Sequence, residues 1–168
     1  RDPVFNQAYR QMSDVIPQSV PTPPVATQNH TLAGGAIEIL GIGPAAGKPL
    51  VGKTDIHVYF RVIEVPAVSY KFQLAVWPTA AGASPTDALP ASVARSAMRA
   101  TADAVYPSDR WQKGQYIRER FSIVLPADWK TESIGVGLAA TSTTGDRAKP
   151  TGAAPANEPN LFVLGALS

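Results

Sequence analysis

The sequence predicts an all-β protein, a single antiparallel β-sandwich of about seven to nine strands, jelly-roll or immunoglobulin-like. Two observations support this prediction. Several segments alternate apolar and polar residues with a period of two, as strands with one buried face do. The 168 residues also include 16 Pro and 13 Gly, which favours a loop-rich β protein over a helical one.

The first predicted strands lie between residues 36 and 77. Residues 36–42 form an apolar run, and residues 54–65 and 69–77 alternate cleanly. In 54–65 the expected inward side chains are Ile56, Val58, Phe60 and Val62, and the expected outward ones are Asp55, His57, Tyr59 and Arg61. In 69–77 the expected inward side chains are Tyr70, Phe72, Leu74 and Val76, and the expected outward ones are Ser69, Lys71, Gln73 and Ala75. The short link Pro66-Ala67 suits a hairpin between these two strands.

The second half of the chain adds strands separated by turn-rich loops. Residues 78–91 and 142–160 are expected to be loops. Residues 92–105 are assigned to a strand or an irregular segment, with a helical turn as the alternative. Expected inward side chains are Ile117, Phe121, Ile123 and Leu125 in one strand and Ile134, Val136, Leu138 and Ala140 in the next. LFVLGAL closes the chain as a last strand.

Residues 1–31 differ from the rest, so we divide the chain into an N-terminal segment, 1–31, and a sandwich domain, 32–168. Residues 3–12 suit a short helix, with Asp2 as N-cap and Pro3 at the first helical position. Four prolines between Ile16 and Pro24 then indicate an extended, polyproline-like connector. Two interpretations stay open, a tether to a larger body and an ordered arm along the sandwich.

Charge and composition exclude several classes of function. The net charge is +2, and residues 103–132 hold five acids and five bases, so no basic face for nucleic acid is expected. The absence of cysteine excludes disulfides, thiolate zinc sites and cysteine nucleophiles. No apolar run approaches the ~20 residues of a membrane span, and no signal peptide is visible. Because the chain begins at Arg1 without Met, we expect an excised piece or a mature product.

A formal phosphate-loop match at residues 47–54, GKPLVGKT, is interpreted as a turn with a solvated Lys53. A nucleotide site needs a helix after the loop, whose N-terminus meets the phosphate. Here an alternating strand follows instead, and Pro49 removes an amide from the cradle. We therefore expect no nucleotide at this loop.

No catalytic, metal or cofactor site is expected. His30 and His57 are the only histidines, and neither has a second ligand at metal spacing. The chain contains no G-x-S-x-G elbow for a hydrolytic triad. Glu119 and Asp128 can be imagined as an acid–base pair, but we assign both as solvated surface charges.

Aromatic side chains are the candidate ligand-binding residues. Exposed rings stack on the apolar faces of sugars, while neighbouring polar groups bind the hydroxyls. The alternative is that the rings fill the ends of the sandwich, which we favour for Trp111 and Trp129. The candidates are Trp77, Trp111, Trp129, Tyr59 and Tyr116. A sugar-binding role requires at least two of them on one exposed, concave surface.

Short motifs within residues 33–147 are shared with a known kind of domain. They are GAIEILGI, GKTDIHVYFRVIEVPAVSYKFQLAVW, YPSDRWQKGQYIRERFSIVLP and IGVGLAAT. Through them the chain resembles the extracytoplasmic C-terminal β-sandwich module of bacterial multi-pass membrane glycosyltransferase-like proteins. The matching positions are Leu40, Gly41, Gly52, Tyr106, Pro107, Trp111, Gly114, Ile117, Glu119, Leu125, Pro126, Gly137, Leu138, Gly145, Asp146 and Arg147. Val62, Ala139 and the long C-terminal loop depart from the family pattern.

The resemblance implies a non-catalytic accessory domain, periplasmic or otherwise extracytoplasmic, joined to a membrane protein through a segment outside this chain. Transferase chemistry would belong to that membrane portion. A glycan or protein partner is implied, without a cofactor and without nucleic acid. The alternatives are a structural or protein-interaction module that binds no glycan, and a small stand-alone enzyme. The oligomeric state stays open.

Overall fold

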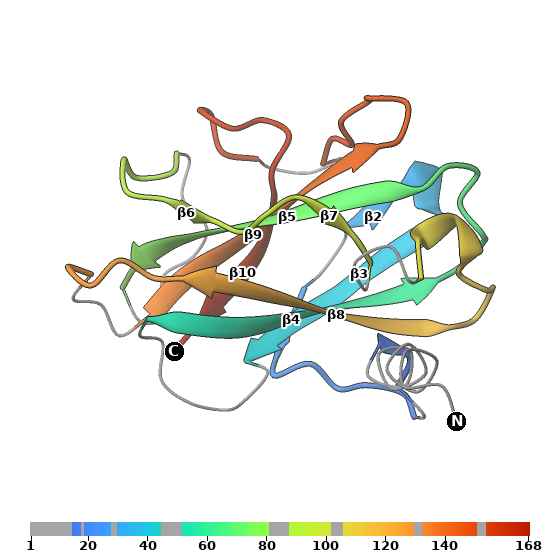
Figure 1. Ribbon diagram of the computed structural model, residues 1–168, viewed down its shortest axis with the longest axis horizontal. Helices are drawn as coiled ribbons and strands as arrows, with labels where there is room; N and C mark the ends of the chain where they lie inside the picture. The colour runs from blue at the N-terminus through green and yellow to red at the C-terminus, as the bar shows by residue number, and fades with distance from the viewer. Residues whose placement is uncertain are drawn as a thin grey trace, which may run out of the picture.

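The computed structural model is a sandwich of two five-stranded antiparallel sheets, which confirms the predicted fold class (Figure 1). It describes residues 15–17, 19–27, 30–44, 52–80, 88–101, 106–129, 133–150 and 154–168. The helix predicted for 3–12 and most of the phosphate-loop match lie outside these residues. The described part holds more strands than predicted because four strands of only two residues add to the six longer ones.

The strands are β1 (Val25–Ala26), β2 (Thr31–Leu32), β3 (Ile37–Pro44), β4 (Lys53–Val62), β5 (Tyr70–Thr79), β6 (Ala94–Arg95), β7 (Arg99–Ala100), β8 (Tyr116–Val124), β9 (Ser133–Ser142) and β10 (Phe162–Leu167). Two 3-10 turns, η1 (Ala33–Gly35) and η3 (Ser108–Arg110), lie between them. Lys53 starts the strand β4, as the alternation of the residues after it predicted. In residues 92–105, the described part is irregular with two short strands, as preferred from the sequence.

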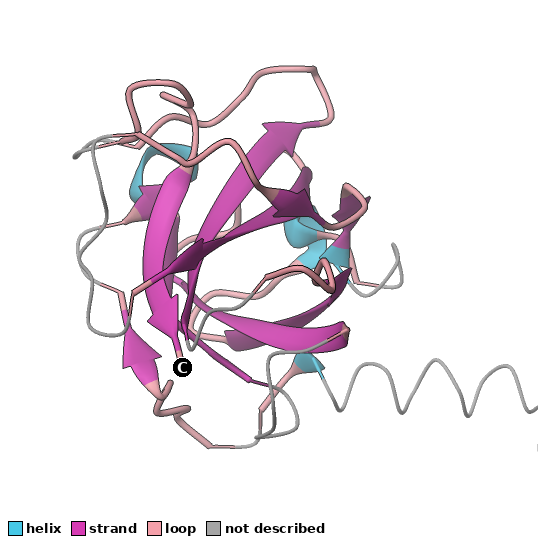
Figure 2. Cartoon of the chain, turned by 90° about the vertical axis from the view of Figure 1, so that its left-hand side faces the viewer, coloured by secondary structure: helices cyan, strands magenta, loops and turns pink. Residues whose placement is uncertain are grey.

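Sheet A has the strand order β1-β3-β4-β8 with β2 also on β3, and sheet B has the order β10-β9-β5-β6 with β7 also on β5. Figure 2 shows the two layers of strands from the side. The predicted hairpin between β4 and β5 is wrong, because these strands belong to different sheets. β4 already pairs with β3 and β8, so the Pro66-Ala67 link crosses from one sheet to the other.

The predicted inward side chains of β4, β5, β8 and β9 are all buried between the sheets. One residue on this inner side differs from the prediction. Glu119, expected to be solvated, is only 3% exposed and lies between Ile117 and Phe121 on the inward row of β8. Its carboxylate is 3.2 Å from the Arg99 guanidinium, which extends from β7. The ion pair explains how a charged side chain occupies a core position.

A second apolar cluster covers the outer face of sheet B. Its buried members are Ala75, Trp77, Leu89, Ala139 and Leu161. On β9 the outward positions Gly135 and Gly137 have no side chain, so the rings and methyl groups of Trp77 and Leu161 lie directly on the strand. A Cβ at Gly137 would be 2.7 Å from Leu161 Cδ2. This cluster holds the loop that precedes β10 against the sheet.

The end of the proline-rich segment lies against the sandwich. Pro24 lies on β3 so closely that a Cβ at Gly43 would be 2.7 Å from the Pro24 ring. Beyond it, β1 and β2 pair with β3, and the predicted domain boundary at 31/32 falls within β2. Thr27 Oγ1 then donates to the Leu164 carbonyl at 2.7 Å, which ties this side of sheet A to β10.

His30 donates a second side-chain hydrogen bond to β10, and we predict that this residue makes stability depend on pH. Its Nε2–H donates to the Val163 carbonyl at 3.0 Å, while Nδ1 is buried without a partner among the described residues. Burial lowers the pKa of His30 from its ordinary 6.5, against the smaller opposite effect of the Val163 hydrogen bond. The unfolded chain therefore binds more protons as the pH falls through the unfolded pKa, and the free energy of unfolding decreases.

Thermal denaturation between about pH 5 and pH 8 measures this effect, because histidine is the side chain that ordinarily titrates in that range. A His30→Gln variant should lose part of the decrease below pH 6.5, and His57→Gln, on the outward face of β4, should retain it. Equal pH profiles for the wild type and His30→Gln would contradict the prediction.

Candidate functional site

Two of the five candidate aromatic residues, Trp77 and Trp111, are buried, and a third, Trp129, is half-buried. Trp111 is 1% exposed and lies in the main core, as the alternative interpretation of this residue expected. Trp77 is 5% exposed in the outer cluster of sheet B. Trp129 is half-buried against the main core, and its Nε1–H donates to Ser92 Oγ at 2.7 Å. Trp77 and Trp111 therefore have no ring face available to a sugar.

The other two candidates, Tyr59 and Tyr116, are half-buried and share the outer face of sheet A. In the register of β4 and β8, Tyr59 is opposite Arg118 and Tyr116 is opposite Arg61. The two tyrosines are thus diagonal neighbours on adjacent strands, within reach of one ligand. We call Tyr59, Tyr116, Arg61 and Arg118, together with His57, the tyrosine face.

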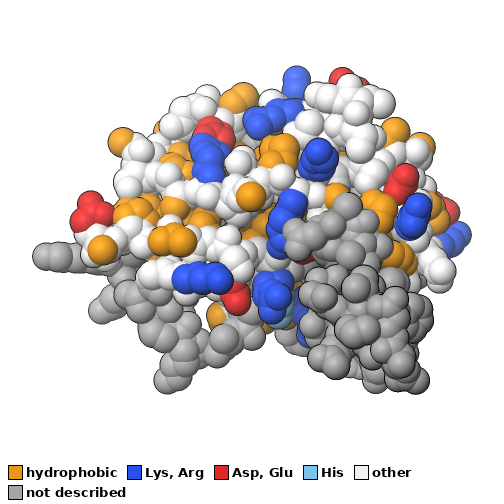
Figure 3. All heavy atoms as spheres, viewed as in Figure 1, with side chains coloured by type: hydrophobic (Ala, Val, Ile, Leu, Met, Phe, Trp, Pro, Cys, Tyr) orange, Lys and Arg blue, Asp and Glu red, His pale blue; other side chains and the backbone are white. Residues whose placement is uncertain are grey.

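The tyrosine face combines ring surfaces with hydrogen-bond donors. The rings of His57 and Tyr59 meet edge to face, with centroids 5.9 Å apart. Further along the same face, Ser122 Oγ donates to Asp55 Oδ1 at 2.6 Å. Figure 3 shows the neighbouring open side of the sandwich, on which β7 and β8 lie, with basic side chains and apolar atoms between them. The tyrosine face itself brings rings and guanidinium groups together on the outer side of sheet A. Such a surface can stack against apolar ring faces and donate to oxygen atoms.

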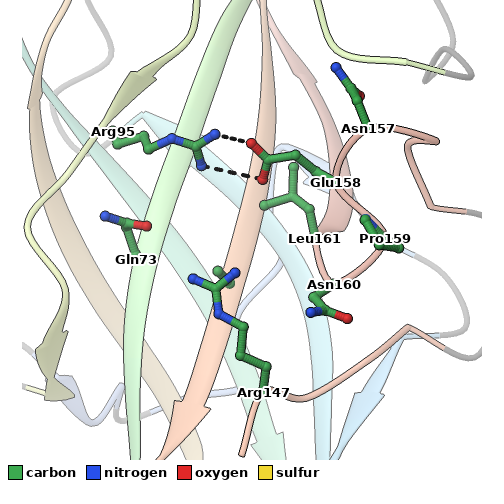
Figure 4. Close-up of a pocket in the computed structure, with 9 residues that line it drawn as sticks. Gln73, Arg95, Arg147, Asn157, Glu158, Pro159, Asn160 and Leu161 are labelled. Carbon is green, nitrogen blue, oxygen red and sulfur yellow. Dashed lines mark hydrogen bonds and ion pairs between the residues drawn. The ribbon is translucent and has the colours of Figure 1, made fainter.

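A pocket of about 350 Å³ lies on the opposite side of the sandwich, on the outer face of sheet B. Its polar side chains are Gln73, Arg95, Arg147, Asn157, Glu158 and Asn160, so we call it the arginine pocket (Figure 4). Ala139, opposite Gln73 in the register of β5 and β9, contributes apolar surface together with Leu161. No candidate from the sequence lines this pocket.

Three local structures hold the arginine pocket in shape. Asn157 accepts a hydrogen bond from the Leu89 backbone amide at 2.9 Å and donates to the Leu89 carbonyl at 3.1 Å. Arg95 and Glu158 form a two-bond ion pair across the pocket (Figure 4). Arg147 pairs with Thr141 of β9 through a β-bridge, and the Ala148 amide donates to the Ala140 carbonyl at 2.9 Å.

The sequence carried only weak signals for this pocket. Its residues come from β5, β6, β9 and two separate parts of the loop expected at 142–160. The one useful signal was the pair of glycines at 135 and 137, which indicates close approach of another segment to β9.

The described residues include no group of three or more His, Cys, Asp or Glu side chains that could hold a metal ion. In this part of the chain, no helix is long and apolar enough to cross a bilayer. Comparison with protein-family models finds no match, and comparison with curated proteins finds no significant relative. The class that the structure defines is an antiparallel β-sandwich with a different polar surface on each of its outer faces.

Proposed function

We propose that the chain is a non-catalytic accessory domain of a bacterial membrane-associated protein and that it contacts glycan outside the cytoplasm through the tyrosine face. The main support is the presence of Tyr59 and Tyr116 as diagonal neighbours on one face. The bacterial, extracytoplasmic setting rests only on the motifs that resemble the glycosyltransferase-associated module.

The chemistry of the tyrosine face suits a carbohydrate. A pyranose ring has apolar C–H faces that stack on aromatic rings, and its hydroxyls accept hydrogen bonds from guanidinium groups. Each tyrosine is directly opposite an arginine on the neighbouring strand, so both kinds of contact are available side by side. β4 pairs on both sides with other strands, which gives the surface a rigid base.

A Tyr59→Ala/Tyr116→Ala variant should bind any recognised glycan about tenfold or more weakly, because each stacked ring contributes about 0.5–1.5 kcal/mol beyond its buried area. A glycan array with the purified chain identifies ligands, and titration calorimetry compares the variants. Tyr59→Phe/Tyr116→Phe is the matched control, since it keeps both rings. Glycan binding that is unchanged in the alanine variant would remove the tyrosine face from the proposal.

The second candidate function is a structural or protein-interaction module. It is favoured by β8, which lies at the edge of sheet A and ends at Val124, an apolar side chain that is 68% exposed. Edge strands with exposed apolar residues are common docking sites for other chains. A folded domain that binds no glycan on the array would favour this candidate.

A further inference from the structure

We propose that the arginine pocket is a separate binding site for a small carboxylate that carries hydroxyl groups, the chemistry of a sugar acid such as a hexuronate. This goes beyond the proposed function, because the site lies on the other sheet and uses none of the residues of the tyrosine face. The charge, the hydrogen-bonding groups and the size of the pocket all suit such a ligand.

The charge balance of the pocket leaves one positive group available. Arg95 and Glu158 neutralise each other through their two-bond ion pair. The Arg147 guanidinium forms no ion pair or hydrogen bond with any residue that the structure describes, although it lines the pocket. Figure 4 shows it pointing along the sheet toward the Arg95–Glu158 pair. A guanidinium presents a planar fork of donors that matches a carboxylate, so Arg147 is the expected anion-binding group.

The amide side chains in the pocket suit hydroxyl groups. Gln73 donates through Nε2 to the Ser96 carbonyl at 3.1 Å, which fixes its amide plane and leaves Oε1 as an acceptor. In Figure 4 the Gln73 side-chain oxygen faces the side of the pocket on which Arg147 lies. Asn160 supplies a second amide at the opposite wall. Since amides both donate and accept, they can satisfy hydroxyls in either role.

Size and rigidity limit the ligand further. The volume of about 350 Å³ is at the small end of the ~300–1,000 Å³ range of small-molecule sites. The apolar atoms of Ala139 and Leu161 give a ring or short carbon chain a surface to lie on. The hydrogen bonds between Asn157 and Leu89 and the buried cluster around Trp77 hold the pocket walls in place before any ligand binds. This reduces the entropy cost of binding.

Titration calorimetry with glucuronate and glucose tests the proposal, since the two differ only in the carboxylate. We expect glucuronate to bind the full chain and glucose to bind at least tenfold more weakly. Methyl glucuronide imitates the end of a glycan and shows whether the natural ligand is a free sugar acid or one attached to a glycan. If it binds as tightly as glucuronate, the ligand is a glycan-borne acid; if it does not bind, the ligand is the free acid. No binding of glucuronate, or equal binding of glucose, would overturn the proposal.

Variants identify the site. Arg147→Ala should weaken glucuronate binding at least tenfold, and Asn160→Ala should weaken it less. Arg110→Ala, an exposed arginine at η3, should leave it unchanged. The Tyr59→Ala/Tyr116→Ala variant should also bind glucuronate normally, so failure of this proposal and failure of the tyrosine face are distinguishable. Wild-type affinity in Arg147→Ala would overturn the assignment.

Discussion

A Glu119→Ala variant should have a free energy of unfolding about 3 kcal/mol lower than the wild type, the low end of the usual cost of breaking a buried ion pair, because Arg99 keeps its hydrogen bond to the Arg120 carbonyl. The Glu119 side chain is 4% exposed and its partner Arg99 is 26% exposed, so the guanidinium remains largely desolvated when the carboxylate is removed. Urea denaturation followed by tryptophan fluorescence measures the loss. Glu119→Gln should cost less, since its amide oxygen still accepts a hydrogen bond from Arg99.

The matched control is the surface pair Glu64–Lys113, whose charged atoms are 2.8 Å apart and whose side chains are 61% and 70% exposed. Exposed pairs contribute about 0.2–1 kcal/mol, so Glu64→Ala should change stability little. Equal destabilisation by Glu119→Ala and Glu64→Ala would show that burial does not decide the strength of the pair.

The Arg99–Glu119 pair closes one open side of the sandwich. The Arg99 guanidinium also donates to the Arg120 carbonyl, and it lies 5.6 Å from the centre of the Phe121 ring. β7 of sheet B is thereby joined to β8, the edge of sheet A. The opposite side is joined by Thr27 and His30, which donate to β10. Side-chain hydrogen bonds therefore connect the two sheets at both edges, where backbone pairing between sheets is absent among the described strands.

The strands could be predicted from the sequence because alternation is a local property. The rows that include Phe60, Phe121 and Leu138 are buried as expected. The sheet assignment could not be predicted in the same way, because the partners of β4 and β8, from Arg61↔Tyr116 to Lys53↔Val124, are 55 to 71 residues apart and no local signal records that pairing. The Pro66-Ala67 link was short enough for a hairpin, yet strand partners and not link length decide which sheet a strand joins.

The sequence-based prediction for Glu119 was wrong for a different reason. The alternation of β8 places it on the inward row, but its charge suggested a solvated position. The deciding partner, Arg99, belongs to a segment without periodicity, so the pair is visible only in three dimensions. Trp77 is comparable, since its burial depends on Gly135 of β9 beneath its ring. Tyr59 was correctly expected on an outward face because that placement follows from alternation alone, and the same alternation places Tyr116 next to the inward Ile117.

The arginine pocket could not be predicted because each of its contributors is ordinary in its own segment. Gln73 and Arg95 lie on paired strands of sheet B, and Arg147 and Asn160 lie in a loop rich in Ala and Pro. The loop folds onto the sheet because Leu161 and Trp77 occupy the space above the two β9 glycines. A pocket made from segments this far apart in the sequence becomes visible only when the packing of the loop is known.

A Trp111→Ala variant should be destabilised by about 3–5 kcal/mol, the usual cost of removing a buried large aromatic side chain. The Trp111 ring is nearly parallel to that of Phe72 at 8°, with centroids 6.3 Å apart, and it is 5.5 Å from the Phe60 ring. Phe60 belongs to sheet A and Phe72 to sheet B, so the variant leaves a cavity between the sheets. Chemical denaturation measures the loss, and near-ultraviolet circular dichroism reports the packing of the remaining aromatic rings.

Two further variants separate packing from hydrogen bonding. Trp111→Phe keeps most of the ring contact but removes the Nε1–H donor to the Tyr106 carbonyl, at 3.3 Å, and should cost clearly less than Trp111→Ala. Trp129→Ala removes a half-buried ring at the margin of the core and should also cost less. If Trp129→Ala destabilises the protein as much as Trp111→Ala, the contact between the two sheets does not depend on the Trp111 ring.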